Sequence, residues 1–268
     1  MKTIVALAIL LSFSTPTVAQ NGDCAALTHQ ALELSGLNQS ISDMTQMMNS
    51  EQFMQQVSRG QGASADFSAA FKPIMMKDFD GSIMRKELEA RLLAQCDPVK
   101  MAAAIEAMKS PLVSRMLALE AEAGTPEGQE KVKCYARAIQ VVPPPDDRLD
   151  AIAVLDDSAG SSDLAADAVI VVTRGMLAGA GDQSNAIEDL VRHRNDLKMS
   201  MRNSLQVSML CTYKSVPRAE ILQYASELRS GPLKPFYDQA KQAFLEVMEE
   251  RAQAAGADLK TVITASAR

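Results

Sequence analysis

Residues 96–116 read CDPVKMAAAIEAMKSPLVSRM, and this stretch decides how the chain folds. Two prolines interrupt a segment that otherwise has the composition of a helix. Asp97 precedes Pro98 and Ser110 precedes Pro111, and both Asp and Ser are favoured at the N-cap of a helix. Proline fits the next position, because the N–H that it lacks has no partner in the first turn. The prolines therefore begin two successive helices instead of breaking one.

The segment between the prolines carries one apolar face. Met101, Ile105, Met108 and Leu112 recur at intervals of three or four residues. This spacing follows the period of an α-helix and gathers the four side chains on one side. The stretch predicts an amphipathic helix that turns a tight corner into the next helix.

A similar pattern returns in residues 215–236, which read SVPRAEILQYASELRSGPLKPF. Pro217 takes the place of Pro98, and Pro232 takes the place of Pro111. The apolar positions of this second copy also have helical spacing: Ile221, Tyr224, Ala225 and Leu228, then Phe236, Ala240, Ala243, Phe244 and Val247. Helical regions precede both copies, so the repeat predicts a tandem duplication.

Signals for β-strands are scarce in this chain. It has no Trp, and runs of β-branched residues are few and short, as at residues 141–142 and 170–172. Ala, Leu, Met, Gln and Glu dominate instead, and all are good helix formers. We therefore expect an all-α fold, a tandem duplicated helical bundle of about ten helices with no sheet.

The repeat also predicts domain boundaries. We expect a first helical repeat over residues 20–142 and a second over residues 148–256. Residues 143–147 are rich in proline and predict a stiff hinge between the repeats. Residues 257–268 are left as a C-terminal tail.

The paired proline corners resemble those of a known bacterial family, domain of unknown function 2059. The matching residues are Asp97-Pro98 with Lys109-Ser110-Pro111-Leu112, and Ala219-Glu220-Ile221-Leu222 with Arg229-Ser230-Gly231-Pro232-Leu233. Val216 departs from the pattern, because a capping residue is expected there. The resemblance implies an exported, all-helical protein and implies no activity, since the family has no assigned chemistry to carry over.

Residues 1–19 have the features of a cleavable secretory signal. Lys2 precedes an apolar core from Ile4 to Phe13, and the segment ends in small residues at Ala19. The core is about half of the roughly 20 apolar residues that a helix needs to cross a bilayer. We therefore expect cleavage after Ala19 and a periplasmic or secreted protein.

The charge pattern argues against two classes of partner. The whole chain has a net charge of −6 and no run of Lys or Arg, so nucleic acid and anionic membrane surfaces are unsuited to it. No second apolar run is long enough to span a membrane, and the best one, residues 165–172, contains Asp167.

The chain has four cysteines, Cys24, Cys96, Cys134 and Cys211. An even count in an exported protein suggests disulfides. Three pairings are possible, and the sequence alone does not choose among them. We favour Cys24–Cys96 and Cys134–Cys211, since each bond would then staple one half of the chain.

One polar cluster is a candidate site. Asp189 lies four residues before His193, so both side chains could face one metal ion or act together in a hydrolase. Arg194 interrupts an apolar stripe and could hold an anionic group or pin a helix through an acidic partner. A charged, solvated helix face explains the same pattern, and we expect no cofactor.

Methionine is the strongest compositional peculiarity, with 16 in the chain. Thioether ligands suit Cu(I), but neighbouring methionines such as Met47 and Met48 point to different sides of a helix. Core filling and a deformable apolar groove are the better interpretations. Residues 175–181 are rich in glycine but lack a phosphate-loop pattern, so they predict a helix end and a loop.

These patterns together favour binding over catalysis. We expect a non-enzymatic exported protein that binds a partner protein or an amphipathic ligand in a groove between helices. The alternative is a periplasmic hydrolase or metal-binding protein that uses His193 and Asp189.

Overall fold

A computed structural model describes residues 17–48, 65–181 and 186–266. Within these ranges every regular element is a helix, which confirms the expected all-α fold. The helices are α1 (Thr17–Leu34), α2 (Leu37–Met48), α4 (Ala65–Asp78), α5 (Gly81–Ala94), α6 (Pro98–Met108), α7 (Pro111–Gly124), α8 (Pro126–Val141), α9 (Asp146–Ala159), α10 (Ser161–Ala180), α11 (Ala186–Arg192), α12 (Arg194–Thr212), α13 (Arg218–Ser230) and α14 (Leu233–Ser266). They outnumber the ten or so expected, because Gly36 and Gly160 adopt positive φ and divide two helical regions.

The first proline corner forms as predicted. The side chain of Asp97 accepts hydrogen bonds from the backbone N–H groups of Val99 and Lys100, at 3.0 and 3.2 Å. Pro98 is the first residue of α6 and Pro111 the first of α7. Met101, Ile105 and Met108 of the predicted stripe are at most 3% exposed.

The second corner differs from the prediction by one residue at each proline. Pro217 is the N-cap of α13, and Pro232 precedes α14, so both helices begin after the proline. Pro235 lies in the first turn of α14, where its missing N–H leaves no helical bond unmade. The predicted stripe on α13 is buried, and so is most of its continuation on α14.

The predicted boundaries need two corrections. The extended link covers residues 142–145, and Asp146 and Asp147 form the first turn of α9 instead of a hinge. Residues 257–266 are not a separate tail, because α14 continues through them. Most of the predicted signal segment lies outside the described residues, and its last residues, 17–19, belong to α1. The duplication itself stays a prediction.

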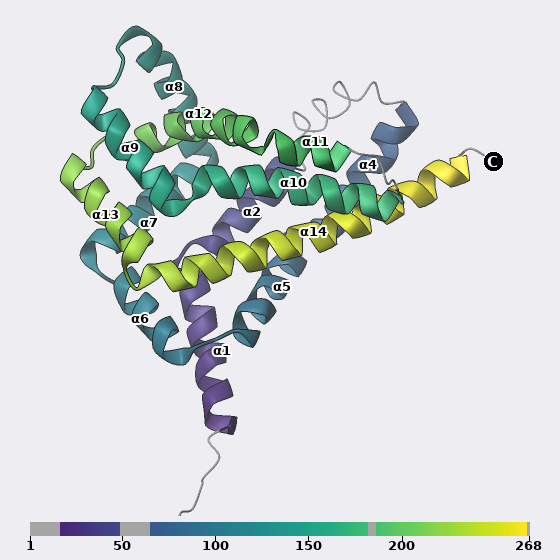
Figure 1. Cartoon of the computed structure of the whole chain (residues 1–268), viewed down its shortest axis with the longest axis horizontal. Coiled ribbons are helices and arrows are strands. Elements are labelled where there is room, and N and C mark those ends of the chain that lie inside the picture. The colour runs from purple at the N-terminus through teal and green to yellow at the C-terminus, as the bar shows by residue number, and fades with distance from the viewer. Residues whose placement is uncertain (1–16, 49–64, 182–185, 267–268) are drawn as a thin grey trace, which may run out of the picture.

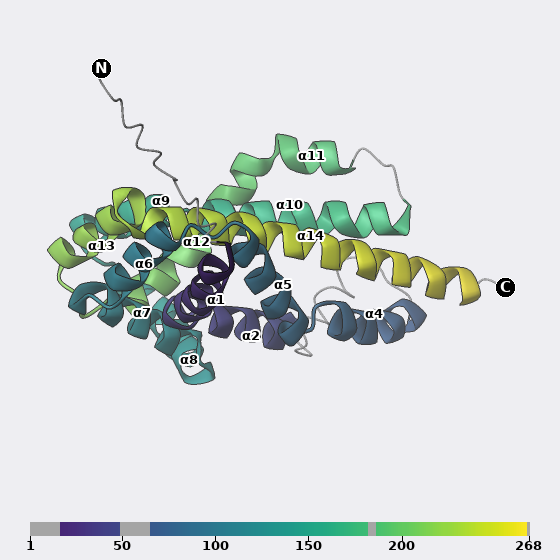
Figure 2. The same cartoon turned by 90° about the horizontal axis from the view of Figure 1, so that it is seen from below.

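Helices α10 and α14 lie side by side and run in the same direction across the molecule (Figure 1; Figure 2). Figure 2 shows α11 displaced from them on one side and α4 on the other. Residues from both predicted repeats enter one contiguous apolar core, with Leu88 and Met108 from the first and Ile152 and Ile221 from the second. Within the described chain the two halves therefore share a core.

Glycines allow α10 and α14 to approach closely. A Cβ atom at Gly179 would collide with the backbone oxygen of Gln253, and one at Gly175 with that of Glu249. Gly256 makes the reciprocal approach to Met176. The expected loop over residues 175–180 is therefore wrong, because these glycines serve helix packing inside α10. Gly181 ends the helix with φ of 72°, as predicted.

One predicted disulfide forms and the other does not. Cys24 and Cys96 are bonded, which ties α1 to the turn between α5 and α6. Cys134 is exposed on α8 and Cys211 is buried on α12, and both are free thiols. The predicted Cys134–Cys211 bond is therefore wrong, because the two side chains point into different surroundings.

Methionine mainly fills the core, which is the first of the two interpretations favoured from the sequence. Met75 and Met84 are 4% and 1% exposed, whereas Met76 is exposed. Met54 lies outside the described residues. None of the described helices combines the length and hydropathy required to cross a membrane.

Candidate ligand-binding cavity

The side chains of the two acid–base residues of the predicted polar site have different partners in the structure. The carboxylate of Asp189 pairs with Arg192. His193 precedes α12 as an exposed N-cap residue, and its Nδ1 lies 2.8 Å from the backbone oxygen of Asp189. In the parts of the chain that the structure describes, no group of three or more His, Cys, Asp or Glu residues could hold a metal ion.

Arg194 pins one helix to another. Its Nε and Nη2 donate to the two carboxylate oxygens of Asp167 at 2.6 and 2.8 Å, and Nη2 also reaches Asp163 at 3.1 Å. Because a guanidinium matches a carboxylate in two parallel hydrogen bonds, the pair fixes α12 against α10. Of the two roles expected for Arg194, the structure therefore shows the pairing with an acidic partner that holds a helix in place.

A buried aspartate holds the neighbouring corner between α9 and α10. Asp156 is 3% exposed and accepts hydrogen bonds from the backbone N–H and the hydroxyl of Ser162, at 2.9 and 2.7 Å. Arg202 of α12 donates to the same carboxylate at 3.0 Å. Three helices are thus joined at one carboxylate.

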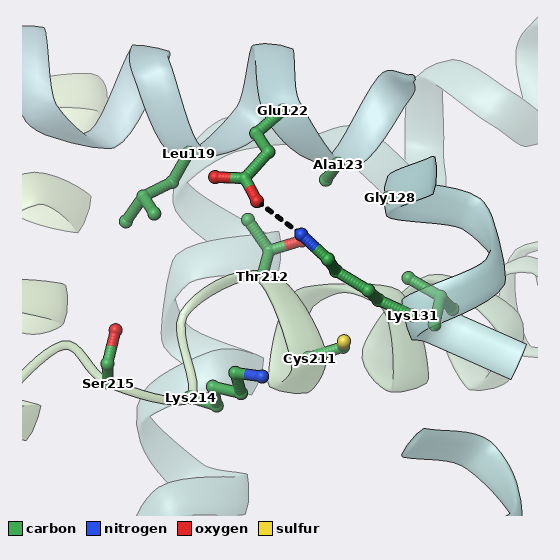
Figure 3. Close-up of a pocket in the computed structure, with 10 residues that line it drawn as sticks. Leu119, Glu122, Ala123, Gly128, Lys131, Cys211, Thr212, Lys214 and Ser215 are labelled. Carbon is green, nitrogen blue, oxygen red and sulfur yellow. Dashed lines mark hydrogen bonds and ion pairs between the residues drawn. The ribbon is translucent and has the colours of Figure 1, made fainter. Parts of the chain in front are cut away.

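A small cavity lies between the α7–α8 hairpin and the end of α12 (Figure 3). Its volume is about 200 Å³, and Figure 3 shows Lys131 reaching across it to Glu122, at 2.8 Å. The free thiol of Cys211 lies in its wall. Burial raises the pKa of that thiol, and the charges of Lys214 and Lys131 only partly oppose the increase. The thiol is therefore suited to packing rather than to nucleophilic chemistry.

A much larger cavity lies on the other side of α7, with a volume of about 820 Å³. Side chains from most of the helices line it, and most of its surface is apolar. The apolar part of the wall includes Leu37, Ile41, Met44, Leu155, Leu164, Ala165, Ala168, Leu205, Met209, Leu228 and Phe244. A cavity of this size falls within the range of roughly 300–1,000 Å³ that is usual for small-molecule sites.

The carboxylate of Glu120 is the central polar group of this cavity. Its Oε1 accepts a hydrogen bond from the hydroxyl of Tyr224 at 3.1 Å and a second one from the hydroxyl of Tyr213. Glu120 as a whole is partly buried, but its carboxylate is enclosed among aromatic side chains. Among the described residues, no hydrogen bond reaches its second oxygen, Oε2, and no cation pairs with it.

Local structure explains why these groups converge. Glu120 follows Val113, Met116 and Leu117 along the buried face of α7, so helical spacing carries it inward. Arg148 of α9 donates to the backbone oxygens of Tyr213 and Val216, which fixes the turn between α12 and α13. That turn presents the phenol of Tyr213 to the carboxylate.

Burial sets the protonation of this cluster. It raises the pKa of Glu120 above the ordinary value, although the hydroxyls of Tyr213 and Tyr224 partly oppose the increase. The pKa values of Tyr213, Tyr224 and Tyr237 are raised as well, first by burial and then by the negative charge of Glu120. The tyrosines therefore stay neutral donors, and Glu120 is the group whose charge can change.

Further polar side chains line the wall, and they include Asp238, Lys241 and Ser158. Lys241 donates to the backbone oxygen of Ala159 at the end of α9, and burial lowers the pKa of its amine. The hydroxyl oxygen of Ser158 is buried and has no hydrogen-bond partner among the described residues. The cavity thus presents a mainly apolar surface with one cluster of hydrogen-bonded polar groups at Glu120 and other polar side chains along the wall.

The chain matches no protein-family model, no curated protein and no solved structure. The resemblance to domain of unknown function 2059 accordingly stays a prediction, and the cavity has to be interpreted from its own chemistry.

The sequence predicted a ligand groove between helices but gave no role to Glu120, the polar centre of this cavity. A signal for Glu120 was present, because an acidic residue occupies a position in the apolar stripe of α7. The chain has four tyrosines, and three of them, Tyr213, Tyr224 and Tyr237, gather around this carboxylate. Their spacing along the chain gives no hint of this, since the three come together only through the packing of α12, α13 and α14.

Proposed function

We propose that this protein binds an amphipathic small molecule outside the cytoplasm, with the apolar part of the ligand in the large cavity. The observation that carries the proposal is the cavity itself, about 820 Å³ of mostly apolar wall that includes the buried carboxylate of Glu120. Burying apolar ligand surface there is favourable, because it removes that surface from water. Polar groups form the smaller part of the wall, as in sites that bind a ligand through an apolar surface and orient it through a few hydrogen bonds.

A small molecule fits this cavity better than a partner helix does. Residues from both halves of the chain surround it, including Ile41 from α2 and Phe244 from α14. Partner helices instead lie along grooves that are open over several turns. The hydrolase and metal alternatives gain no support, since Asp189 pairs with Arg192 and His193 turns to a backbone oxygen.

The test fills the cavity and measures binding of a fluorescent apolar probe, N-phenyl-1-naphthylamine. Ala168 of α10 lines the cavity, so Ala168→Phe should occupy space that the probe needs. Ala178 lies on the same helix, is exposed and does not line the cavity, so Ala178→Phe is the matched control. We expect saturable probe binding that Ala168→Phe weakens at least tenfold and Ala178→Phe leaves unchanged.

Folding of both variants is checked by circular dichroism, and Ala165→Phe serves as a second cavity variant if Ala168→Phe is unfolded. Absence of saturable binding to the wild-type protein would refute the proposal. Equal binding by all folded variants would refute it too, because the probe would then lie elsewhere.

A further inference from the structure

The head group of the ligand can be inferred from the charge of the cavity. Glu120 is a carboxylate in an apolar enclosure, and within the described chain no Lys, Arg or His neutralises it. An ionised carboxylate is costly to bury unless a cation or several hydrogen bonds compensate it. The two tyrosine hydroxyls supply part of this compensation, and both go to Oε1.

The second oxygen of Glu120 is the position that a ligand can use. Oε2 accepts no hydrogen bond from any described residue, while Tyr213 and Tyr224 fix the orientation of the carboxylate through Oε1. A donor placed at Oε2 would complete the coordination of the carboxylate. A cationic donor would in addition balance its charge, and charge-assisted hydrogen bonds are about twice as strong as neutral ones.

The basic side chain in the wall points to the same conclusion. Lys241 is the only basic side chain that lines the cavity in the described residues, and its amine is already bonded to the backbone oxygen of Ala159. Asp238 and Asp163 add negative potential at that amine, and Lys234 partly opposes them. An anionic head group would therefore find one amine, which already donates to a backbone oxygen, and the buried carboxylate of Glu120.

We propose that the ligand is a cationic amphiphile, a single amine head group on an aliphatic chain, and that Glu120 binds the amine. This inference rests on the proposed function, because it specifies the ligand of the same cavity. In the complex, an ammonium N–H donates to Oε2, the tyrosines hold Oε1, and the aliphatic chain lies along the apolar wall.

The test compares three ligands with the same chain and different head groups: dodecylamine, dodecanol and dodecanoate. Each competes with N-phenyl-1-naphthylamine below its micelle concentration at neutral pH. One charge-assisted hydrogen bond predicts that dodecylamine binds about tenfold more tightly than dodecanol. Dodecanoate should bind most weakly.

Two variants locate the effect. Glu120→Gln keeps an acceptor for both tyrosines and removes the charge, so it should weaken dodecylamine binding about tenfold and change dodecanol binding much less, because an alcohol can also accept a hydrogen bond from the new amide. Glu122→Gln is the matched control, because that carboxylate lies two residues away on the same helix and lines the small cavity instead. It should change neither affinity.

The outcomes separate the inference from the proposed function. If all three ligands bind equally, or dodecanoate binds most tightly, the cavity binds amphiphiles but the amine assignment is wrong. Unchanged dodecylamine binding by Glu120→Gln would overturn it as well. If none of the three displaces the probe, both proposals fail, and elution of the protein as a dimer would then assign the cavity to a second copy.

Discussion

Helices α10 and α14 run side by side, yet the two ends of this pair are packed in opposite ways. At the C-terminal end of α10, Gly175 and Gly179 bring the helix against the backbone of α14. At the N-terminal end, Leu164 and Ala168 face the large cavity. Seven residues, two helical turns, separate Ala168 from Gly175, so both lie on one side of the helix.

The difference shows that a small residue has no fixed role. Where an opposing backbone is close, as at Gly179, the missing side chain permits contact. Where other helices splay apart, as at Ala168, a small side chain leaves space. At the N-terminal end of α10, polar contacts join it to α9 through Asp156 and to α12 through Arg194 and Asp167. The close contact between α10 and α14 and the cavity beside Ala168 therefore both depend on small residues along one side of α10.

The largest expected effect comes from disrupting the close contact between α14 and the C-terminal end of α10. Gly179→Leu places a side chain where the backbone of Gln253 lies, so the two helices must separate. Overpacking of this kind costs about 3 kcal/mol of unfolding free energy, near the upper end of the usual range. Urea denaturation measures the loss, with exposed Ala178→Leu as the control, which should change stability by less than about 0.5 kcal/mol. Equal stability of the two variants would contradict the close approach.

A smaller loss of unfolding free energy is expected when the polar contacts at the N-terminal end of α10 are removed. Asp156→Ala removes the acceptor for both groups of Ser162 and one partner of Arg202. Unmet hydrogen bonds at this buried position should cost about 2 kcal/mol in the same denaturation experiment. Asp157→Ala is the control, since that neighbouring aspartate is exposed and bonds only Arg202 in the described chain. A loss as large for Asp157→Ala would show that the guanidinium, not the corner, matters.

The smallest effect concerns pH at the cavity. Burial raises the pKa of Glu120 in the folded state, so the folded protein holds this proton more tightly than the unfolded chain does. The stabilisation from Glu120 is therefore fully present below the ordinary pKa of 4.5 and is lost as pH rises through the folded value. Glu120→Gln does not titrate.

The free energy of unfolding of wild type relative to Glu120→Gln should accordingly fall as pH increases from about 4 toward neutrality. Tyr213, Tyr224 and Tyr237 surround the carboxylate and stay neutral in this window, because their pKa values are raised further. Urea denaturation of both proteins across the pH range measures the difference. A constant difference, or one that grows with pH, would show that Glu120 is not desolvated.

Local chemistry made much of the fold predictable. Asp97 and Pro98 specify the start of a helix, because the side chain of Asp97 accepts hydrogen bonds from backbone N–H groups only two and three residues away. The structure confirms this helix start. Spacing along α13 likewise identified the buried side chains, from Ile221 to Leu228. Pro217 shows the limit of this reasoning, because a proline can cap a helix as well as begin it.

The site was less predictable because it depends on contacts between distant segments. Glu120 and Tyr224 are separated by 104 residues, and their hydrogen bond exists only when α7, α12 and α13 are packed. The pairing of Cys211 failed for the same reason, since nothing near it in sequence indicates that its thiol is buried away from Cys134. Asp189 and His193 are close in sequence, but their local helix geometry gives each of them another partner.

The parallel course of α10 and α14 has a consequence for the order of folding. Two parallel neighbouring helices cannot be joined by a short turn. The residues of the ion pair between α10 and α14, Arg174 and Glu249, are 75 residues apart in sequence. During synthesis, the glycine face of α10 leaves the ribosome long before its counterpart exists. The contact between α10 and α14 must therefore form late in folding. A chain that is interrupted before α14 keeps the glycine face of α10 exposed to other hydrophobic surfaces.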